Sequence, residues 1–228
     1  MGISERRARE KDALRQKILQ AATELFLQDG FDSVTMRAIA DRIEYAPSTI
    51  YLYFKNKIEI VDAICVETFE VLIDRLHEIE QKFPSPVASL AASIGCYIEF
   101  GIEYPHQYRL VFGNVASDSF TESAESNLLG RQALEHLVSI IAGGQQAGHF
   151  PATTDPASDA LIVWSHIHGT TSILINDHGR YNLPWPSIKF MIQRSIDLIT
   201  KGLQSPATPG FLSLPPPQNF FRTMLIRT

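Results

Sequence analysis

The stretch from Ala46 to Lys57, APSTIYLYFKNK, decides how the N-terminal part of this chain is interpreted. A proline and two small hydroxyl residues come near its start, three aromatic residues follow, and two lysines lie near its end. Lysines are costly in a hydrophobic core, and a solvated surface has no need of three aromatic side chains. The stretch therefore needs an explanation other than core packing or plain solvation.

The residues before this stretch predict two further helices. Apolar side chains recur with helical spacing over 14–26, and Gly30 stands where a C-terminal cap belongs. Thr35 suits the N-cap of a short second helix, which ends before a three-residue turn at 44–46. Pro47 suits the first turn of a third helix, where no backbone donor is needed. This arrangement predicts a helix-turn-helix unit whose last helix enters the major groove of DNA.

The predicted recognition helix offers groups that suit DNA. Small residues at its N-terminal end let the backbone approach the bases, and the hydroxyls of Ser48 and Thr49 reach bases or phosphates. Tyr51 and Tyr53 can donate to phosphates or touch thymine methyl groups, with core packing as the alternative for both. The expected DNA-binding residues are Thr35, Arg37, Pro47, Ser48, Thr49, Tyr51, Tyr53 and Lys57.

Three side chains after this helix receive separate predictions. Phe54 is expected to plug the core under the helix, and Lys55 to be solvated. Lys57 lies in the first turn of the next helix, beside backbone donors that favour an anion, so a phosphate is its expected partner. The basic N-terminal arm before Asp12 is expected to add phosphate or minor-groove contacts.

The rest of the chain also has helical spacing and predicts an all-α fold of about nine helices. Asn56 and Glu59 form a capping pair for a helix of about 26 residues. Two further helices are expected over 87–103 and 106–112, followed by a Ser/Thr/Asp-rich loop at 114–124. A helix is then expected from this loop to about residue 147, another from Asp155, and a last one from about 186 to 202. The segment after residue 204 holds five prolines and is expected to be loosely packed or disordered.

Charge and composition restrict the class of protein. Residues 1–57 hold ten Lys/Arg and eight Asp/Glu, whereas the remainder holds ten and seventeen, within a net charge of −5. A basic head on an acidic body is the asymmetry expected of a DNA-binding protein. The lack of a long apolar run or signal peptide, and two cysteines expected to be reduced and buried, favour a cytoplasmic protein with no membrane span.

The N-terminal motifs resemble the tetracycline-repressor (TetR) family of transcriptional regulators. The family pattern is R-x-x-I-L-x-A-A-x-x-L-F, then G-F, T-x-x-x-I-A and T-[LI]-Y-x-Y-F-x-x-K. This chain matches it at Arg15, Ile18, Leu19, Ala21, Ala22, Leu25, Phe26, Gly30, Phe31, Thr35, Ile39, Ala40, Thr49, Ile50, Tyr51, Tyr53, Phe54 and Lys57, with every spacing intact. Trp164, His168 and Gly169 resemble the Trp-x-x-x-His-Gly signature of one subgroup.

The resemblance implies a homodimer whose last two long helices form a four-helix bundle with those of the partner. It implies a ligand cavity among the middle helices, and a ligand that spreads the two heads so that they no longer fit a palindromic operator. The expected division is a helix-turn-helix domain at 1–57, a ligand-binding and dimerisation domain at 58–203, and a Pro-rich tail at 204–228. The expected partners are operator DNA, a small-molecule effector and a second copy of the chain.

The turn departs from the family pattern. Glu44 replaces a glycine that tolerates positive φ, and Ala46 replaces a serine that acts as a cap and a candidate phosphate contact. These departures put the base contacts in question, but not the fold.

An aromatic set in the body is the expected ligand site. The functional reading is a pocket for a largely apolar molecule, oriented by tyrosine hydroxyls or an imidazole. The alternative for each residue is ordinary core packing. The expected lining residues are Tyr97, Phe100, Tyr104, Tyr108, Phe112, Trp164 and His168.

Other classes of function find little support in the sequence. His166 and His168 point to different faces of a helix, so no metal site is expected. No cofactor is expected, and no motif for a nucleophile with its base, for a phosphate loop or for a zinc protease indicates an enzyme. The sequence therefore predicts a ligand-responsive repressor. The alternatives are an activator of the same fold and a small-molecule binding protein without DNA binding.

Overall fold

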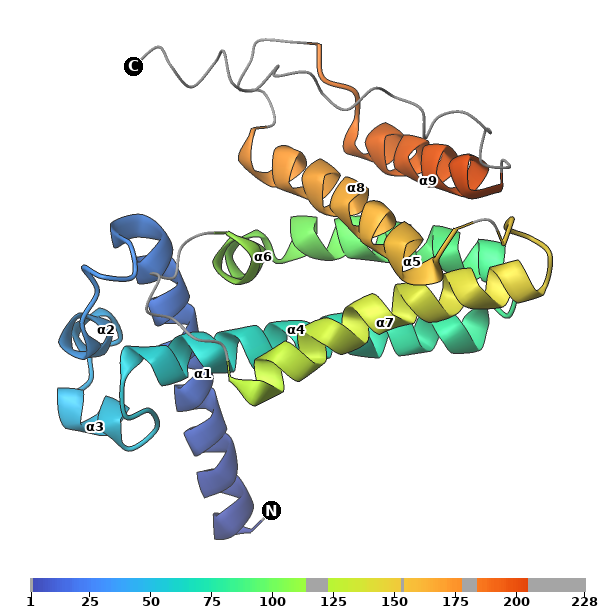
Figure 1. The fold of residues 1–228 in the computed structure, drawn as a ribbon. Coiled ribbons are helices and arrows are strands. Elements are labelled where there is room, and N and C mark those ends of the chain that lie inside the picture. Colours follow the sequence, from blue (N-terminus) through green and yellow to red (C-terminus); the bar gives the residue numbers. More distant parts are fainter. Residues whose placement is uncertain (1, 114–122, 153, 178–183, 205–228) are drawn as a thin grey trace.

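The computed structural model describes residues 2–113, 123–152, 154–177 and 184–204. They form α1 (Ile3–Asp29), α2 (Met36–Arg42), α3 (Pro47–Tyr51), α4 (Lys57–Lys82), α5 (Pro86–Glu103), α6 (Pro105–Phe112), α7 (Ala124–Gln146), α8 (Pro156–Asn176) and α9 (Ile188–Gln204) (Figure 1). Within these ranges the chain forms no strand, so the all-α prediction is confirmed. The Pro-rich tail and most of the loop predicted at 114–124 lie outside the described residues.

The N-terminus differs from the prediction, because α1 begins at Ile3 and includes the residues expected to form a basic arm. This segment is rich in Arg, Glu, Lys and Ala, which are strong helix formers. Glu5 accepts a hydrogen bond from the Gly2 backbone (3.0 Å), and Arg6 pairs with Glu10 one turn later (3.2 Å). Local propensity and capping therefore extend the helix beyond its apolar face, as a projecting end (Figure 1).

The helix-turn-helix elements begin where the capping residues place them. Thr35 caps α2 by accepting from the Ala38 backbone (3.1 Å), and Pro47 occupies the first turn of α3. Ile39 of α2 and Ile50 of α3 are fully buried in one cluster with apolar side chains of α1. Asn56 accepts from the Glu59 backbone (2.9 Å) at the start of α4, so the predicted cap is confirmed.

Helix α4 contributes to two separate clusters of buried side chains. Its first turns, with Ile60 and Ile64, pack with α1–α3, and we call this unit the head. Its later turns, from Leu72 to Ile79, pack with α5, α7 and α8, which with α6 and α9 form the body. Leu110 of α6 also belongs to the head cluster. Helices α4 and α6 are thus shared between the head and the body.

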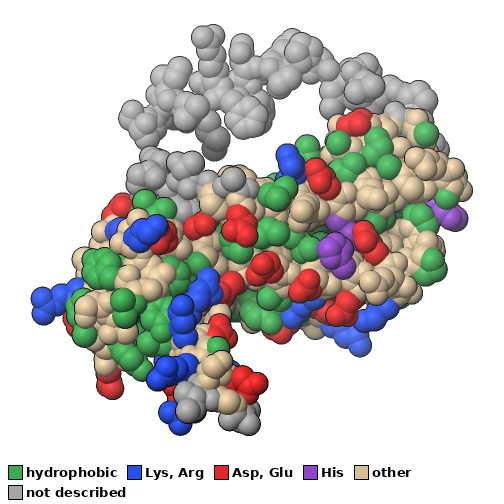
Figure 2. Space-filling view, turned by 90° about the horizontal axis from the view of Figure 1, so that it is seen from below, with side chains coloured by type: hydrophobic (Ala, Val, Ile, Leu, Met, Phe, Trp, Pro, Cys, Tyr) green, Lys and Arg blue, Asp and Glu red, His purple; other side chains and the backbone are tan. Residues whose placement is uncertain are grey.

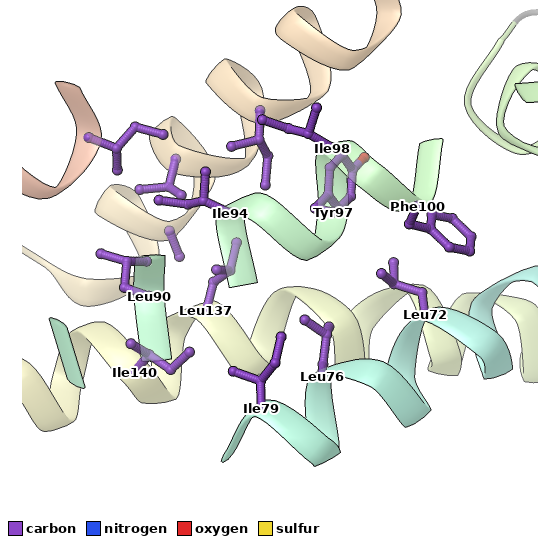
Figure 3. Packing of buried hydrophobic residues seen from close by; sticks show 14 of the residues in the cluster. Leu72, Leu76, Ile79, Leu90, Ile94, Tyr97, Ile98, Phe100, Leu137 and Ile140 are labelled. Atoms are coloured by element: carbon purple, nitrogen blue, oxygen red, sulfur yellow. The ribbon is translucent and has the colours of Figure 1, made fainter. Parts of the chain in front are cut away.

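The body core is formed by helices that cross in layers. Figure 3 shows Leu76 and Ile79 of α4 beneath Leu90 and Ile94 of α5, with side chains of α7 beside them. Close approach at Gly144 helps to join α7 to the segment that follows it. A Cβ at Gly144 would lie 2.2 Å from the Phe150 ring, so only glycine fits there.

Candidate nucleic-acid interface and ligand cavity

The outer face of α3 exposes apolar side chains that no other described element covers. Tyr51 is 55% exposed and Leu52 is 80% exposed, while Ser48 is exposed beside them. Pro47 and Thr49 are half-buried. The exposure of Tyr51 removes core packing as its explanation and leaves its phenol available to a partner.

Tyr53 and Phe54 face the other way. Tyr53 is half-buried against the head cluster, and Phe54 is 5% exposed within it. The prediction that Phe54 fills the core is therefore confirmed. The ring of Tyr53 helps to support α3, so core packing explains Tyr53 better than it explains Tyr51.

Lys57 has partners other than a phosphate in this structure. Its Nζ donates to the backbone carbonyl oxygens of Phe31 (2.6 Å), Asp32 (3.2 Å) and Val34 (3.2 Å), and lies 4.3 Å from the centre of the Phe31 ring. An ammonium group has three N–H donors, so this geometry leaves none for the expected phosphate. Lys57 instead fastens the loop between α1 and α2 to the start of α4.

The start of α2 places two further predicted residues on the surface. The Thr35 oxygen is used as a cap, but its O–H remains able to donate to a phosphate. The Arg37 side chain is 81% exposed, and its nearest acid is Asp41 at 3.8 Å. Such an exposed pair contributes little to stability, so a phosphate can replace Asp41 as the partner of Arg37.

The turn between α2 and α3 keeps a left-handed residue although it lacks a glycine. Glu44 has a φ of 61°, and the Tyr45 backbone donates to the Ala40 carbonyl oxygen at 3.0 Å. The turn is therefore formed with a side chain in a conformation that usually costs about 1–2 kcal/mol. Ala46 provides no side-chain cap to α3, as predicted from the sequence.

Replacing Glu44 with glycine should therefore stabilise the protein. We expect Glu44→Gly to raise the free energy of unfolding by about 0.5–1 kcal/mol, because relief of the backbone strain exceeds the added chain entropy. Denaturant unfolding measures this change. Glu44→Ala is the matched control, since it removes the carboxylate but keeps the Cβ; an equal gain in this variant would show that charge, not φ, is the cause.

Positive charge is concentrated at the head. On the face shown in Figure 2, Lys and Arg side chains cluster on the head, including the projecting end of α1, whereas the body carries more Asp and Glu. The predicted recognition helix therefore belongs to the part of the chain that attracts a polyanion.

A cavity of about 400 Å³ lies in the body between α4, α5, α6, α7 and α8. Three of the residues expected at a ligand site, Tyr97, Phe112 and Trp164, line it. The other lining residues are Phe69, Leu72, Leu76, Ser93, Val111, Ser126, Asn127, Gly130, Arg131, Ala133, Leu134, Leu137 and Ile167. A mostly apolar wall with a few polar groups is typical of a small-molecule site.

Tyr108 and His168 form a hydrogen-bonded network beside this cavity rather than in its lining. The Tyr108 hydroxyl lies 2.7 Å from His168 Nδ1 and 3.2 Å from the Tyr97 hydroxyl. Burial lowers the pKa of His168, raises the pKa of Tyr97 to about 12 and also raises the pKa of Tyr108. All three groups are therefore uncharged near neutral pH, and the His168 ring stacks between Tyr108 and Trp164.

Phe100 and Tyr104 do not reach this cavity. Their rings pack together, with centres 5.3 Å apart, and the Arg75 guanidinium lies 5.8 Å and 5.3 Å from the two ring centres. They line a different hollow of about 380 Å³ that α1 and α4 also border. Aromatic character grouped them with Tyr97, but it does not separate them from the cavity residues, because the end of α5 packs against α4 and the head.

Polar residues at the N-terminal end of α7 also belong to the site, although no pattern in the sequence predicts them. Ser126 lines the cavity, and its hydroxyl donates to Asp62 of α4 at 3.0 Å. The Ser123 backbone also donates to Asp62 (3.2 Å), so one carboxylate receives two bonds from the start of α7. These partners lie more than 60 residues apart in the chain, and no local pattern in the sequence indicates their contact.

The described ranges show no group of three or more His, Cys, Asp or Glu side chains placed to hold a metal ion. Among the same residues, no helix is both long and apolar enough to cross a bilayer.

Comparison with known families gives the head and the body the same assignment. Residues 18–64 match the model described as bacterial regulatory proteins, tetR family. Residues 90–194 match the tetracyclin repressor-like C-terminal domain, and the two matches together span more than half of the chain. The chain belongs to the tetR family. This tetR-family protein is a ligand-responsive, DNA-binding regulator of transcription and not an enzyme.

Two curated relatives of this tetR-family chain are regulators. The fatty acid metabolism regulator protein of Bacillus subtilis is 25% identical over 177 residues, which cover 73% of this chain and 86% of that protein. The HTH-type transcriptional activator FasR of Mycolicibacterium smegmatis is 29% identical over 105 residues. That match covers 46% of this chain and 48% of FasR, about half the length of each.

Solved structures confirm the tetR-family fold. The regulator FadR from Bacillus subtilis, solved in complex with stearoyl-CoA, has a TM-score of 0.70 at 20% identity and covers 82% of this chain and 98% of its own. FadR from Bacillus halodurans has a TM-score of 0.69 at 17% identity, with the same shares covered.

Proposed function

We propose that this protein is a homodimeric repressor that binds a palindromic operator in the cytoplasm and is released by a small, largely apolar molecule. The observation that carries the proposal is the apolar cavity of about 400 Å³, which lies against α4, a helix that the head and the body share. A ligand that displaces α4 changes the placement of the head. The proposed domains are 1–57 and 58–203, with 204–228 as a tail.

The proposed operator contacts come from the exposed starts of α2 and α3. They are Thr35, Arg37, Pro47, Ser48, Thr49 and Tyr51, with Tyr53 mainly supporting the helix from below. Two such heads about 34–36 Å apart would meet half-sites one turn of DNA apart.

The proposed effector is a molecule with a long acyl chain, such as a fatty acyl thioester. A similar protein of Bacillus subtilis is named a fatty acid metabolism regulator, and the similar structure of FadR from Bacillus subtilis was solved in complex with stearoyl-CoA. The lining of Phe69, Leu72, Leu134 and Leu137 suits a hydrocarbon chain, because burying each CH₂ group contributes about 0.8 kcal/mol.

The central test uses the purified protein and random duplex DNA. We expect selection at about 0.1 M salt to yield a palindrome with fixed half-site spacing, and stearoyl-CoA to release the protein from it. If the folded dimer enriches no DNA sequence, the proposed DNA binding is contradicted. If stearoyl-CoA leaves the affinity for the selected DNA unchanged, the proposed effector class is contradicted.

Activation is the second candidate, because FasR is described as an activator. Transcription in vitro from the selected promoter distinguishes the two. A repressor lowers transcript yield when it binds, and the ligand restores it; an activator does the opposite.

Substitutions on α3 should separate base reading from phosphate contact. We expect Ser48→Ala to change preference at one operator position by about 1–3 kcal/mol, and Tyr51→Phe to weaken binding to every sequence alike. Binding to a panel of single-base operator variants measures both. Ser139→Ala, on the exposed surface of α7, is the control. An equal loss at all positions from Ser48→Ala would exclude base reading by that residue.

A further inference from the structure

A chain of three polar side chains connects the surface of the body to the ligand cavity. The Ser93 hydroxyl, which lines the cavity, lies 3.0 Å from His136 Nε2. His136 Nδ1 in turn lies 2.9 Å from Glu80 Oε1. Ser93 and His136 are 1% and 7% exposed, whereas the Glu80 side chain is 48% exposed. The three residues come from α5, α7 and α4, and the proposed ligand cavity lies at the serine end.

The exposed end of the chain fixes the direction of its hydrogen bonds. An ionised Glu80 carboxylate can only accept, so His136 Nδ1 carries the hydrogen and donates to it. A neutral imidazole then presents Nε2 as an acceptor, and the Ser93 hydroxyl donates to it. Burial lowers the pKa of His136, the Glu80 hydrogen bond partly offsets this, and neutral His136 is favoured near pH 8.

Ser93 differs from the buried threonines in where its hydroxyl donates. The hydroxyls of Thr23, Thr68, Thr171 and Thr200 all donate to the carbonyl oxygen four residues earlier in their own helix. The Ser93 hydroxyl donates to His136 Nε2 instead. Its single hydrogen is used, and the remaining capacity of its oxygen is to accept a hydrogen bond from the cavity.

We propose that Ser93 is an acceptor subsite in the ligand cavity, set by His136 and Glu80, and that among ligands with a long hydrocarbon chain it favours those that also carry a hydroxyl donor. This rests on the proposed function of the cavity. The same order of residues occurs in serine hydrolases, which also need N–H donors for an oxyanion. Ser93 lies in the interior of α5, where backbone N–H groups are used by the helix, so the arrangement suits binding rather than catalysis.

The test uses three small probes of nearly equal length: 1-decanol, 2-decanone and decane. At pH 8 we expect the protein to bind 1-decanol about tenfold more tightly than 2-decanone, because only the alcohol donates to Ser93. Calorimetric titration measures the affinities. Ser93→Ala should remove this preference while decane binding stays unchanged. Ser89→Ala is the matched control, since Ser89 is buried one turn earlier in α5 and is not part of the cavity lining.

A second variant and a second pH test the role of His136. His136→Leu frees the Ser93 hydrogen, so we expect the ratio of alcohol to ketone affinity to fall about tenfold. Protonation of His136 at acidic pH, below the ordinary range of an imidazole, should lower the ratio in the wild type but not in His136→Leu. The other titratable side chains around His136 are Glu80 and His77 of α4 and Glu135 of α7. Equal affinities for alcohol and ketone in the folded wild type would overturn the inference but leave the cavity intact. Binding of none of the probes would overturn the proposed cavity as well.

Discussion

Replacing Ile162 with aspartate is expected to convert the proposed dimer to a monomer. Ile162 is 68% exposed on α8, and Leu161 beside it is 47% exposed. On α9, Phe190 and Leu198 are 56% and 49% exposed. So much apolar surface on two neighbouring helices indicates a covered face, and the proposed partner is the same face of a second chain.

The size of the effect follows from symmetry. In a twofold interface each substitution occurs twice, and burying an unpaired carboxylate costs several kcal/mol. We expect the dimer dissociation constant to rise at least about 100-fold, which corresponds to about 3 kcal/mol. Sedimentation equilibrium at micromolar concentration measures it, and operator affinity should fall in parallel.

Leu128→Asp is the matched control for this experiment. Leu128 is 43% exposed on α7, away from the α8–α9 face, so the same charge change should leave the dimer intact. A dimer that survives Ile162→Asp but not Leu128→Asp would place the interface elsewhere.

Sequence reasoning located helix boundaries well where a local signal sets them. Asn56, Thr35 and Asp155 all cap the helices predicted from them, because an N-cap acts within three residues. The start of α1 was missed, because its first turns are exposed and lack an apolar face that would reveal them. Helix propensity, which hydrophobic periodicity does not reveal, accounts for those turns.

The sites were harder to predict because they depend on contacts between distant residues. Tyr97, Phe112 and Trp164 were identified as cavity residues from aromatic character, yet Phe100 shares that character and lies outside. Lys57 illustrates the same limit. The helix start that favours an anion is visible in the sequence, but the three carbonyl groups of the loop after α1 that hold its ammonium are not.

The contact of Asp62 with the start of α7 provides a route from the cavity to the head. Ser126 lines the cavity and donates to Asp62 (3.0 Å), which also accepts from the Ser123 backbone (3.2 Å). The neighbour of Asp62 in the chain, Val61, is fully buried in the head cluster. A ligand that moves the start of α7 therefore acts on the turn of α4 that supports the head.

Removing this carboxylate should uncouple the ligand from DNA binding. We expect Asp62→Ala to bind operator and stearoyl-CoA nearly as the wild type does, but the ligand should weaken operator binding about tenfold less, a loss of about 1.4 kcal/mol of coupling. Operator titrations with and without saturating stearoyl-CoA measure the coupling. Asp62→Asn keeps an acceptor oxygen and should retain most of the coupling. Asp74→Ala, which makes the same change on the exposed side of α4, is the matched control. Full coupling in Asp62→Ala would show that the signal reaches the head by another contact. The alternative contact in this fold is made by α6, whose Leu110 belongs to the head cluster.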